Sequence, residues 1–134
     1  MLSLRTAGVH VLSLALAVAI AFALIEPVPP DIDAVVRQFS FPVDKLAHFG
    51  LFLVAAFPWR RSFVRLGMRS PNVAVVVAAA AYGGALEIAQ GLWTTRDPEV
   101  LDMLAGALGA LVAVALTLLV RSLRKNSERQ GAPV

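Results

Sequence analysis

Four long apolar stretches constrain the fold of this chain more than any other feature of its sequence. They cover residues 6–25, 43–59, 73–93 and 101–120; the second is the shortest and begins with polar side chains. A helix of about 20 apolar residues crosses the roughly 30 Å of a bilayer core, where backbone groups cannot stay unpaired. We therefore expect an all-α protein, a four-helix transmembrane bundle that forms a single domain over residues 1–134.

The composition excludes an ordinary soluble enzyme. Hydrophobic residues make up 58% of the 134 residues and charged residues 16%, whereas a soluble domain carries about 25% charged residues. A chain this small has too little interior to bury so much apolar surface. The lack of cysteine in the sequence excludes a disulfide scaffold, a thiolate metal site and a cysteine nucleophile.

The first stretch has two interpretations. Arg5 precedes it and Ala21-Phe22-Ala23 resembles a cleavage site, as in a secretory signal peptide. The apolar run is longer than the 7–15 residues of a typical signal peptide, which favours a retained membrane helix. His10 is the only strongly polar residue within this stretch.

Basic residues are concentrated on one side of the predicted membrane. If the N-terminus is cytoplasmic, most of the 12 basic residues fall in cytoplasmic segments, namely Arg5, Arg60, Arg61, Arg65, Arg69, Arg121, Arg124, Lys125 and Arg129. This bias predicts that both termini are cytoplasmic and that residues 121–134 form a basic cytoplasmic tail. Such residues bind membrane lipids, so the net charge of +3 requires no nucleic-acid partner.

Polar side chains interrupt the apolar stretches at three places. The residues are Asp44, Lys45, His48, Glu87, Gln90, Arg96 and Asp102. Spacings of three and four place the first three on one helical face, and Glu87 and Gln90 share another. The predicted topology brings all seven to the outer side of the membrane. Charged groups at membrane depth normally face the bundle interior and pair with one another, so we expect these residues to form one ligand-binding site.

This set of residues is compatible with three kinds of function. A binding site for a lipid headgroup would use Lys45 and Arg96 as cations. An intramembrane enzyme acting on a lipid or a lipid-linked cell-wall precursor would use His48 as a general base, oriented by Asp44 or Glu87. A purely structural ion-pair network would only hold the helices together. We expect no metal and no cofactor, because one histidine with carboxylates is a poor zinc ligand set.

The order of these polar groups resembles the pattern of the VanZ-like family of small bacterial integral membrane proteins. That pattern runs Asp-Lys-x-x-His, Glu-x-x-Gln, Arg and Asp, followed by small residues. Here it reads Asp44-Lys45-Leu46-Ala47-His48, Glu87-Ile88-Ala89-Gln90, Arg96, Asp102 and Gly109, within about half of the chain, 43–113. The chain departs from the pattern at Phe52, where the family usually has tyrosine, and at Gly106, where it usually has asparagine.

The resemblance implies a multi-pass protein of the bacterial plasma (inner) membrane. The family takes its name from a protein linked to teicoplanin resistance, so the resemblance also implies a link to glycopeptide tolerance and a lipid-like or lipoglycopeptide ligand. The missing tyrosine hydroxyl weighs against catalysis. We therefore predict a non-enzymatic protein of the cell envelope that binds an amphiphile or lipid headgroup at the outer leaflet.

Overall fold

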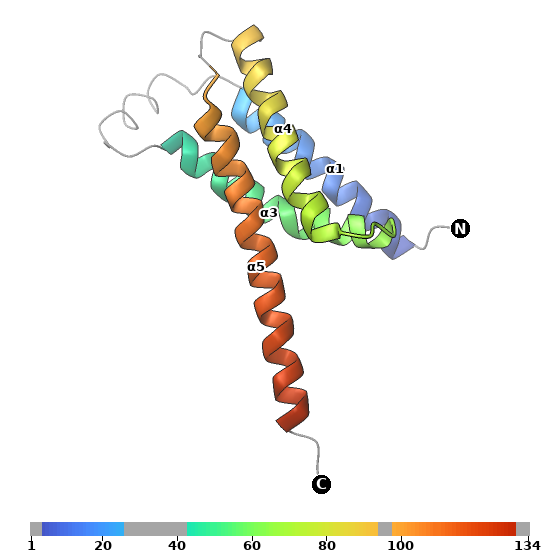
Figure 1. Ribbon diagram of the computed structural model, residues 1–134. Helices are drawn as coiled ribbons and strands as arrows, with labels where there is room; N and C mark the ends of the chain where they lie inside the picture. Colours follow the sequence, from blue (N-terminus) through green and yellow to red (C-terminus); the bar gives the residue numbers. More distant parts are fainter. Residues whose placement is uncertain (1–3, 26–42, 94–97, 131–134) are drawn as a thin grey trace.

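The chain forms four α-helices in the computed structural model, which describes residues 4–25, 43–93 and 98–130 (Figure 1). The helices are α1 (Leu4–Ile25), α3 (Val43–Arg65), α4 (Pro71–Trp93) and α5 (Val100–Gln130). The described residues contain no strand. The prediction of an all-α, four-helix fold is therefore confirmed.

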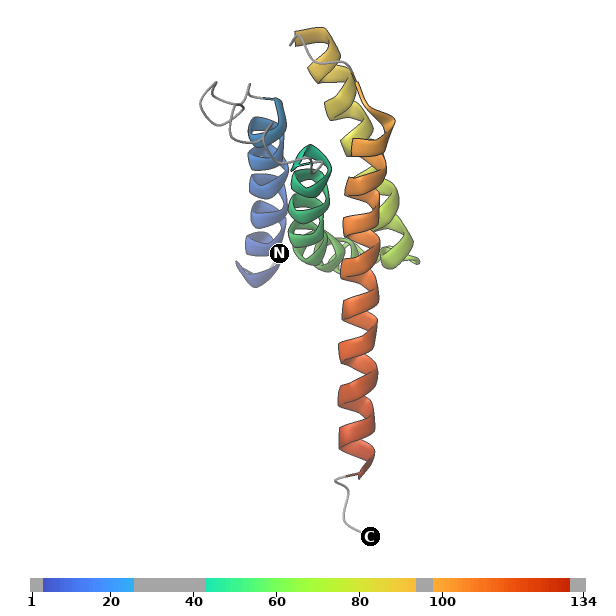
Figure 2. The same ribbon diagram turned by 90° about the vertical axis from the view of Figure 1, so that its left-hand side faces the viewer.

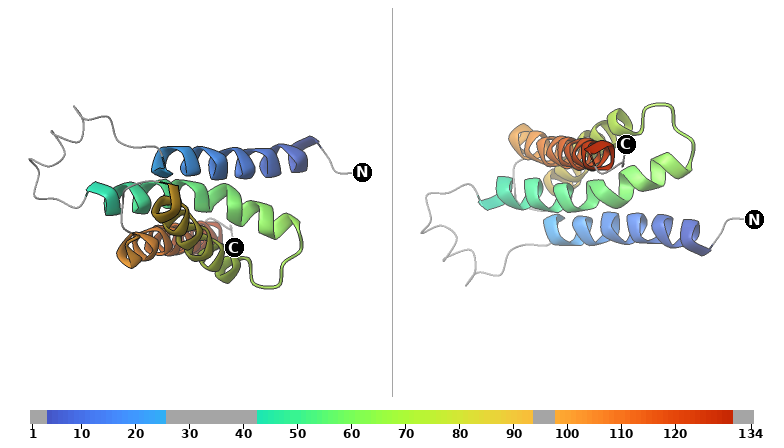
Figure 3. Two further views of the ribbon diagram at one scale, coloured as in Figure 1. Left: turned by 90° about the horizontal axis from the view of Figure 1, so that it is seen from above. Right: turned by 90° about the horizontal axis from the view of Figure 1, so that it is seen from below.

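The helices run alternately up and down the bundle. The carboxyl ends of α1 and α4 and the amino ends of α3 and α5 lie at the same end (Figure 2). Helix α3 lies between α1 on one side and α4 and α5 on the other (Figure 3), and its most extensive contact is with α5. The polar residues at these four helix ends are thus brought to one end of the molecule.

Three helices, α1, α4 and α5, are long and apolar enough to cross a membrane. They also present large apolar side chains outward, including Val11, Phe22, Val77 and Leu111. Such faces suit contact with lipid tails, because lipid imposes no cost on exposed apolar surface. Helix α3 is not among these three, and it carries charged residues at both ends.

The helices extend beyond most of the predicted boundaries. Helix α3 continues from the predicted end at residue 59 to Arg65 and stops where Gly67 adopts a left-handed conformation, φ 70°. The Met68 N–H then donates to the Phe63 carbonyl at 3.1 Å, a glycine-type helix end that apolarity alone does not reveal. Residues 121–130 of the predicted basic tail belong to α5, which continues as a helix to Gln130 and projects beyond the other helices (Figure 1).

An aromatic cluster fills the middle of the bundle. Phe52 is completely buried and contacts Trp59 edge-on, and both rings pack against Tyr82 of α4. The polar tips of two of these rings reach α1: the Trp59 indole N–H donates to the Ser13 carbonyl at 2.9 Å, and the Tyr82 hydroxyl donates to the Ala17 carbonyl at 2.5 Å. Buried tyrosine and tryptophan normally find such partners, and here they attach α1 to α3 and α4.

Small residues allow α3 and α5 to approach closely. A methyl group added at Gly109 would overlap the backbone carbonyl oxygen of Phe49, and it would lie 3.1 Å from the Leu53 nitrogen. Gly109 is spaced four residues from both Ala105 and Ala113, the small-residue spacing that favours close packing in membranes. This close contact sets the distance between the two helices that carry His48 and Asp102.

The opposite end of the bundle also contains paired polar groups. His10 of α1 is hydrogen-bonded through Nδ1 to the Ser62 hydroxyl, so its partner comes from the part of α3 that lies beyond the predicted apolar stretch. The Arg60 guanidinium is buried and donates from Nε to the Asn72 side-chain oxygen at 2.7 Å. These contacts join α1, α3 and α4 at the basic end.

Candidate functional site

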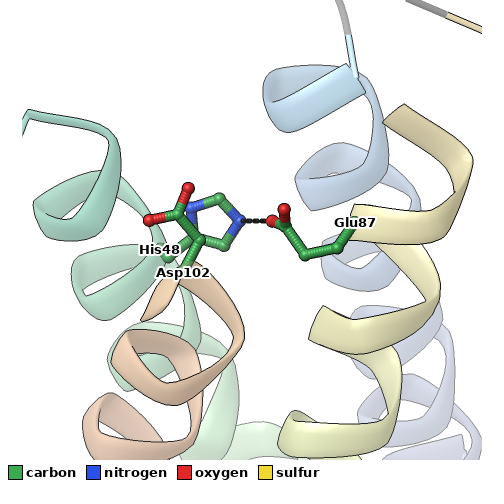
Figure 4. Close-up of side chains that lie close together, drawn as sticks. All are labelled: His48, Glu87 and Asp102. Atoms are coloured by element: carbon green, nitrogen blue, oxygen red, sulfur yellow. Dashed lines mark ion pairs between the residues drawn. The ribbon is translucent and has the colours of Figure 1, made fainter. Parts of the chain in front are cut away.

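Three side chains from three helices meet inside the polar end of the bundle. They are His48 of α3, Glu87 of α4 and Asp102 of α5, and their exposed fractions are 1%, 5% and 4%. The His48 Nε2 atom lies 3.1 Å from the Glu87 Oε1 atom, and the Asp102 carboxylate lies beside the imidazole ring (Figure 4). One ligating atom from each residue lies within 4.8 Å of the other two. We call these three residues the buried triad.

Local sequence explains how each member of the triad is positioned. Asp102 lies in the first turn of α5, where the helix dipole favours a carboxylate. Glu87 faces inward on α4 together with the buried Leu86, whereas Ile88 is exposed. His48 lies one turn into α3, and its Nδ1 donates to the Asp44 backbone carbonyl at 3.0 Å. That hydrogen bond fixes both the orientation of the ring and the nitrogen that carries the proton.

An exposed rim of charged residues surrounds the triad. Lys45 Nζ lies 2.5 Å from Glu99 Oε2 and 3.1 Å from Asp102 Oδ1, so it links the surface to the buried carboxylate. The side chains of Lys45 and Glu99 are 28% and 57% exposed. The Glu99 backbone N–H donates to Glu87 Oε2 at 2.9 Å, which connects the start of α5 to α4. We define the rim as Asp44, Lys45 and Glu99.

The structure brings together four of the seven predicted site residues: Lys45, His48, Glu87 and Asp102. Asp44 has an exposed side chain, and it orients His48 through its backbone carbonyl.

The Gln90 side chain contacts the end of α1. Its side-chain amide is buried and donates to the Leu24 carbonyl at 2.5 Å, at the end of α1. The last carbonyls of a helix have no partner within it, so Gln90 helps to hold α1 against α4. Arg96 lies outside the described residues.

Sequence reasoning did not include Glu99 in the site. Its position three residues before Asp102, at the start of a helix, was the available signal. Charge pairing with Lys45 becomes evident only when α3 and α5 are placed side by side. In this arrangement Lys45 pairs with two carboxylates, that of Asp102 in α5 and that of Glu99 just before the helix.

The two departures from the VanZ-like pattern lie against each other. A methyl group at Gly106 would lie 3.0 Å from a carbon of the Phe52 ring. Phe52 in turn stacks on His48, with ring centroids 6.5 Å apart and an angle of 6° between the planes. One side of the histidine is therefore covered by an apolar ring, and the space beside that ring depends on the glycine.

Comparisons with known proteins give no relative: no family model matches the chain, and neither a curated protein nor a solved structure matches it. The resemblance to the VanZ-like family therefore stays a prediction. The geometry of the triad and the rim carries the functional argument.

Proposed function

We propose that this chain is a multi-pass protein of the bacterial plasma membrane, in which α3 crosses the bilayer as a fourth span and both termini are cytoplasmic. Helix α3 lies between α1 and the pair α4 and α5, which are apolar enough to cross. Its charged residues gather at its two ends, where they reach the membrane surfaces. The basic residues near Arg60 and Arg121 then lie on the cytoplasmic side, and the triad and rim lie on the outer side.

We propose further that the rim binds the headgroup of a cell-envelope amphiphile without turning it over. The observation that carries this proposal is the charge of the described part of the site: Lys45 pairs with the carboxylates of Glu99 and Asp102, and those of Glu87 and Asp44 lie at the same end of the bundle. When these are ionised and His48 is neutral, the described residues of the site carry more negative than positive charge. A headgroup with an ammonium group offsets that excess, and its phosphate pairs with Lys45 by charge-assisted hydrogen bonds. The favoured ligand is therefore a zwitterionic amphiphile, of which phosphatidylethanolamine is the simplest probe.

Burial of the triad favours binding by the rim over catalysis by the triad. His48 is nearly inaccessible and is covered by Phe52, so a general base in this position has no open route to a substrate at the surface. The exposed side chains of Lys45 and Glu99 are the groups that a headgroup reaches first. A binding role uses the rim as it stands, whereas an enzyme would require the triad to open.

The test is lipid retention by the purified chain, measured by native mass spectrometry after exchange into mixed micelles. We expect phosphatidylethanolamine to be retained in preference to phosphatidylglycerol and phosphatidylcholine, and Glu99→Gln to reduce this preference. Glu128→Gln is the matched control, because it removes an exposed carboxylate from the opposite end of α5. Equal retention of the three lipids would contradict the proposal.

Two further arms of the same experiment address the alternatives. In the first arm, teicoplanin is added, because the VanZ-like resemblance implies a lipoglycopeptide ligand. If teicoplanin is retained selectively in place of the phospholipid, the ligand is a lipoglycopeptide and not a zwitterionic phospholipid. Appearance of new lipid products during incubation would favour the intramembrane enzyme. Retention that is unchanged in Glu99→Gln, with normal folding, would leave the polar residues as a structural network.

A further inference from the structure

The tautomer of His48 determines what its second nitrogen offers to the triad. Nδ1 lies 3.0 Å from the Asp44 backbone carbonyl oxygen, which is only an acceptor, so Nδ1 carries the proton. In a neutral imidazole the other nitrogen, Nε2, then presents a lone pair. That lone pair faces Glu87 Oε1 at 3.1 Å, and an ionised carboxylate oxygen is also an acceptor. Two acceptors at this distance repel unless a proton or another cation lies between or beside them.

Asp102 adds a third carboxylate or imidazole group to this cluster, in which one ligand atom from each residue lies within 4.8 Å of the other two. Among the described residues, His48 Nε2, Glu87 Oε1 and Asp102 Oδ1 are the buried side-chain atoms that make no hydrogen bond. Lys45 Nζ lies at ion-pair distance from Asp102 Oδ1, but its direction does not satisfy hydrogen-bond geometry. Buried polar atoms seldom lack a hydrogen-bond partner, because each unsatisfied group costs about 1–3 kcal/mol of stability. The three atoms thus form an electron-rich centre in which, among the described residues, Lys45 pairs with Asp102 and no lysine or arginine pairs with His48 Nε2 or Glu87 Oε1.

The geometry suits a metal ion. Ligating nitrogen and oxygen atoms lie about 2.0–2.2 Å from a transition-series divalent cation, so neighbouring ligands are roughly 3.0–3.5 Å apart. The distance from His48 Nε2 to Glu87 Oε1 is in that range, and the 4.8 Å limit for the whole set requires only a small inward movement of a carboxylate.

Two of the three ligands, His48 and Glu87, are also held by a hydrogen bond from behind. The Asp44 carbonyl accepts from His48 Nδ1, and the Glu99 N–H donates to Glu87 Oε2 at 2.9 Å. Metal-binding histidines characteristically donate their other N–H to a carbonyl or carboxylate, which fixes the tautomer that metal binding requires. The side chain of Lys45 has Glu99 as a second partner, so it can leave Asp102 when a cation approaches. These supports distinguish the triad from an incidental group of acidic residues.

We propose that His48 Nε2, Glu87 Oε1 and Asp102 Oδ1 bind one divalent cation of the Mn²⁺ or Zn²⁺ class. One imidazole with two carboxylates is a mixed nitrogen and oxygen set, which such ions accept and which suits Mg²⁺ and Ca²⁺ less well. This reverses the expectation from sequence, which placed these residues together but judged one histidine with carboxylates a poor zinc ligand set. The inference rests on the proposed function only for the location of the site at a membrane surface. The cation would be bound by the buried triad, beneath the rim.

The experiment measures the bound ion directly, with no amphiphile present. The full chain, purified in detergent and stripped with EDTA, is titrated with Mn²⁺, and free ion is followed by electron paramagnetic resonance. We expect one ion per chain, displaced by Zn²⁺. Electron spin-echo modulation of bound Mn²⁺ should show coupling to an imidazole ¹⁴N, which reports the His48 ligand without any substitution.

Variants and outcomes complete the test. Glu87→Gln and Asp102→Asn should each weaken Mn²⁺ binding by at least about ten-fold, a loss that even second-shell changes produce, while Glu128→Gln binds as the unaltered chain does. If either variant fails to fold, the ¹⁴N coupling of the unaltered chain decides the question. Absence of that coupling, or binding unchanged in both folded variants, would overturn the proposal. Metal binding without headgroup preference would refute the proposed function alone, and headgroup preference without metal would refute this inference alone.

Discussion

Replacing Gly109 by alanine is the sharpest test of how α3 and α5 pack. The added methyl group would overlap the Phe49 carbonyl oxygen, and a backbone atom cannot rotate away as a side chain can. Overpacking of this kind costs about 1–3 kcal/mol. Gly50→Ala is the matched control on α3, because nothing lies within 4 Å of a methyl group there. Alanine favours a helix over glycine by up to about 1 kcal/mol, so Gly50→Ala should be neutral or stabilising.

Both variants gain this helix propensity, so we expect them to differ in unfolding free energy by the overpacking cost alone, about 1–3 kcal/mol. The assay is loss of helical circular dichroism as the mole fraction of sodium dodecyl sulfate increases in mixed micelles, with both variants and the unaltered chain measured together. Gly109→Ala should unfold at the lowest fraction. If it unfolds with, or after, Gly50→Ala, the close approach of α3 and α5 is wrong, and with it the position of His48 relative to Asp102.

Three further predictions follow from other contacts. Lys45→Met should destabilise the chain by about 1–3 kcal/mol in the same assay, because the buried Asp102 carboxylate loses its cationic neighbour, whereas Lys125→Met on the exposed part of α5 should be neutral. Trp59→Phe should cost about 1 kcal/mol through the lost hydrogen bond to α1; equal stability would show that this bond contributes nothing. A phosphatase fusion after Arg65 should be inactive in bacteria and a green fluorescent protein fusion there should fluoresce, because both reporters would be cytoplasmic; the reverse pattern would refute the proposed topology.

Much of the fold could be predicted because lipid exposure leaves few alternatives. Apolar runs near 20 residues dictate helices, and the four runs correspond in order to the four helices of the described residues. The ends of the helices were harder to predict. Helix α3 stops at a glycine motif and not at the last apolar residue, and the basic segment after Val120 has enough good helix formers to continue α5.

The site was predictable in part for the same reason. Alternating helix direction places the start of α3, the end of α4 and the start of α5 together, so the convergence of His48, Glu87 and Asp102 followed from topology. The rotation of each helix about its own axis did not follow from topology. That rotation turns Gln90 toward α1, and it brings Glu99 to Lys45. It depends on close packing at positions such as Gly109, which periodicity does not resolve.

The convergence of the triad is the central claim, and a distance across the helix interface tests it most directly. Rotational-echo double-resonance NMR on the chain in lipid bilayers, with ¹⁵N-labelled histidine and ¹³C-carboxyl-labelled glutamate, measures the proximity of the His48 ring to Glu87. We predict strong dephasing, consistent with the 3.1 Å between Nε2 and Oε1, that disappears in Glu87→Gln. A ring nitrogen of His48 with no carboxyl carbon in recoupling range would contradict the account.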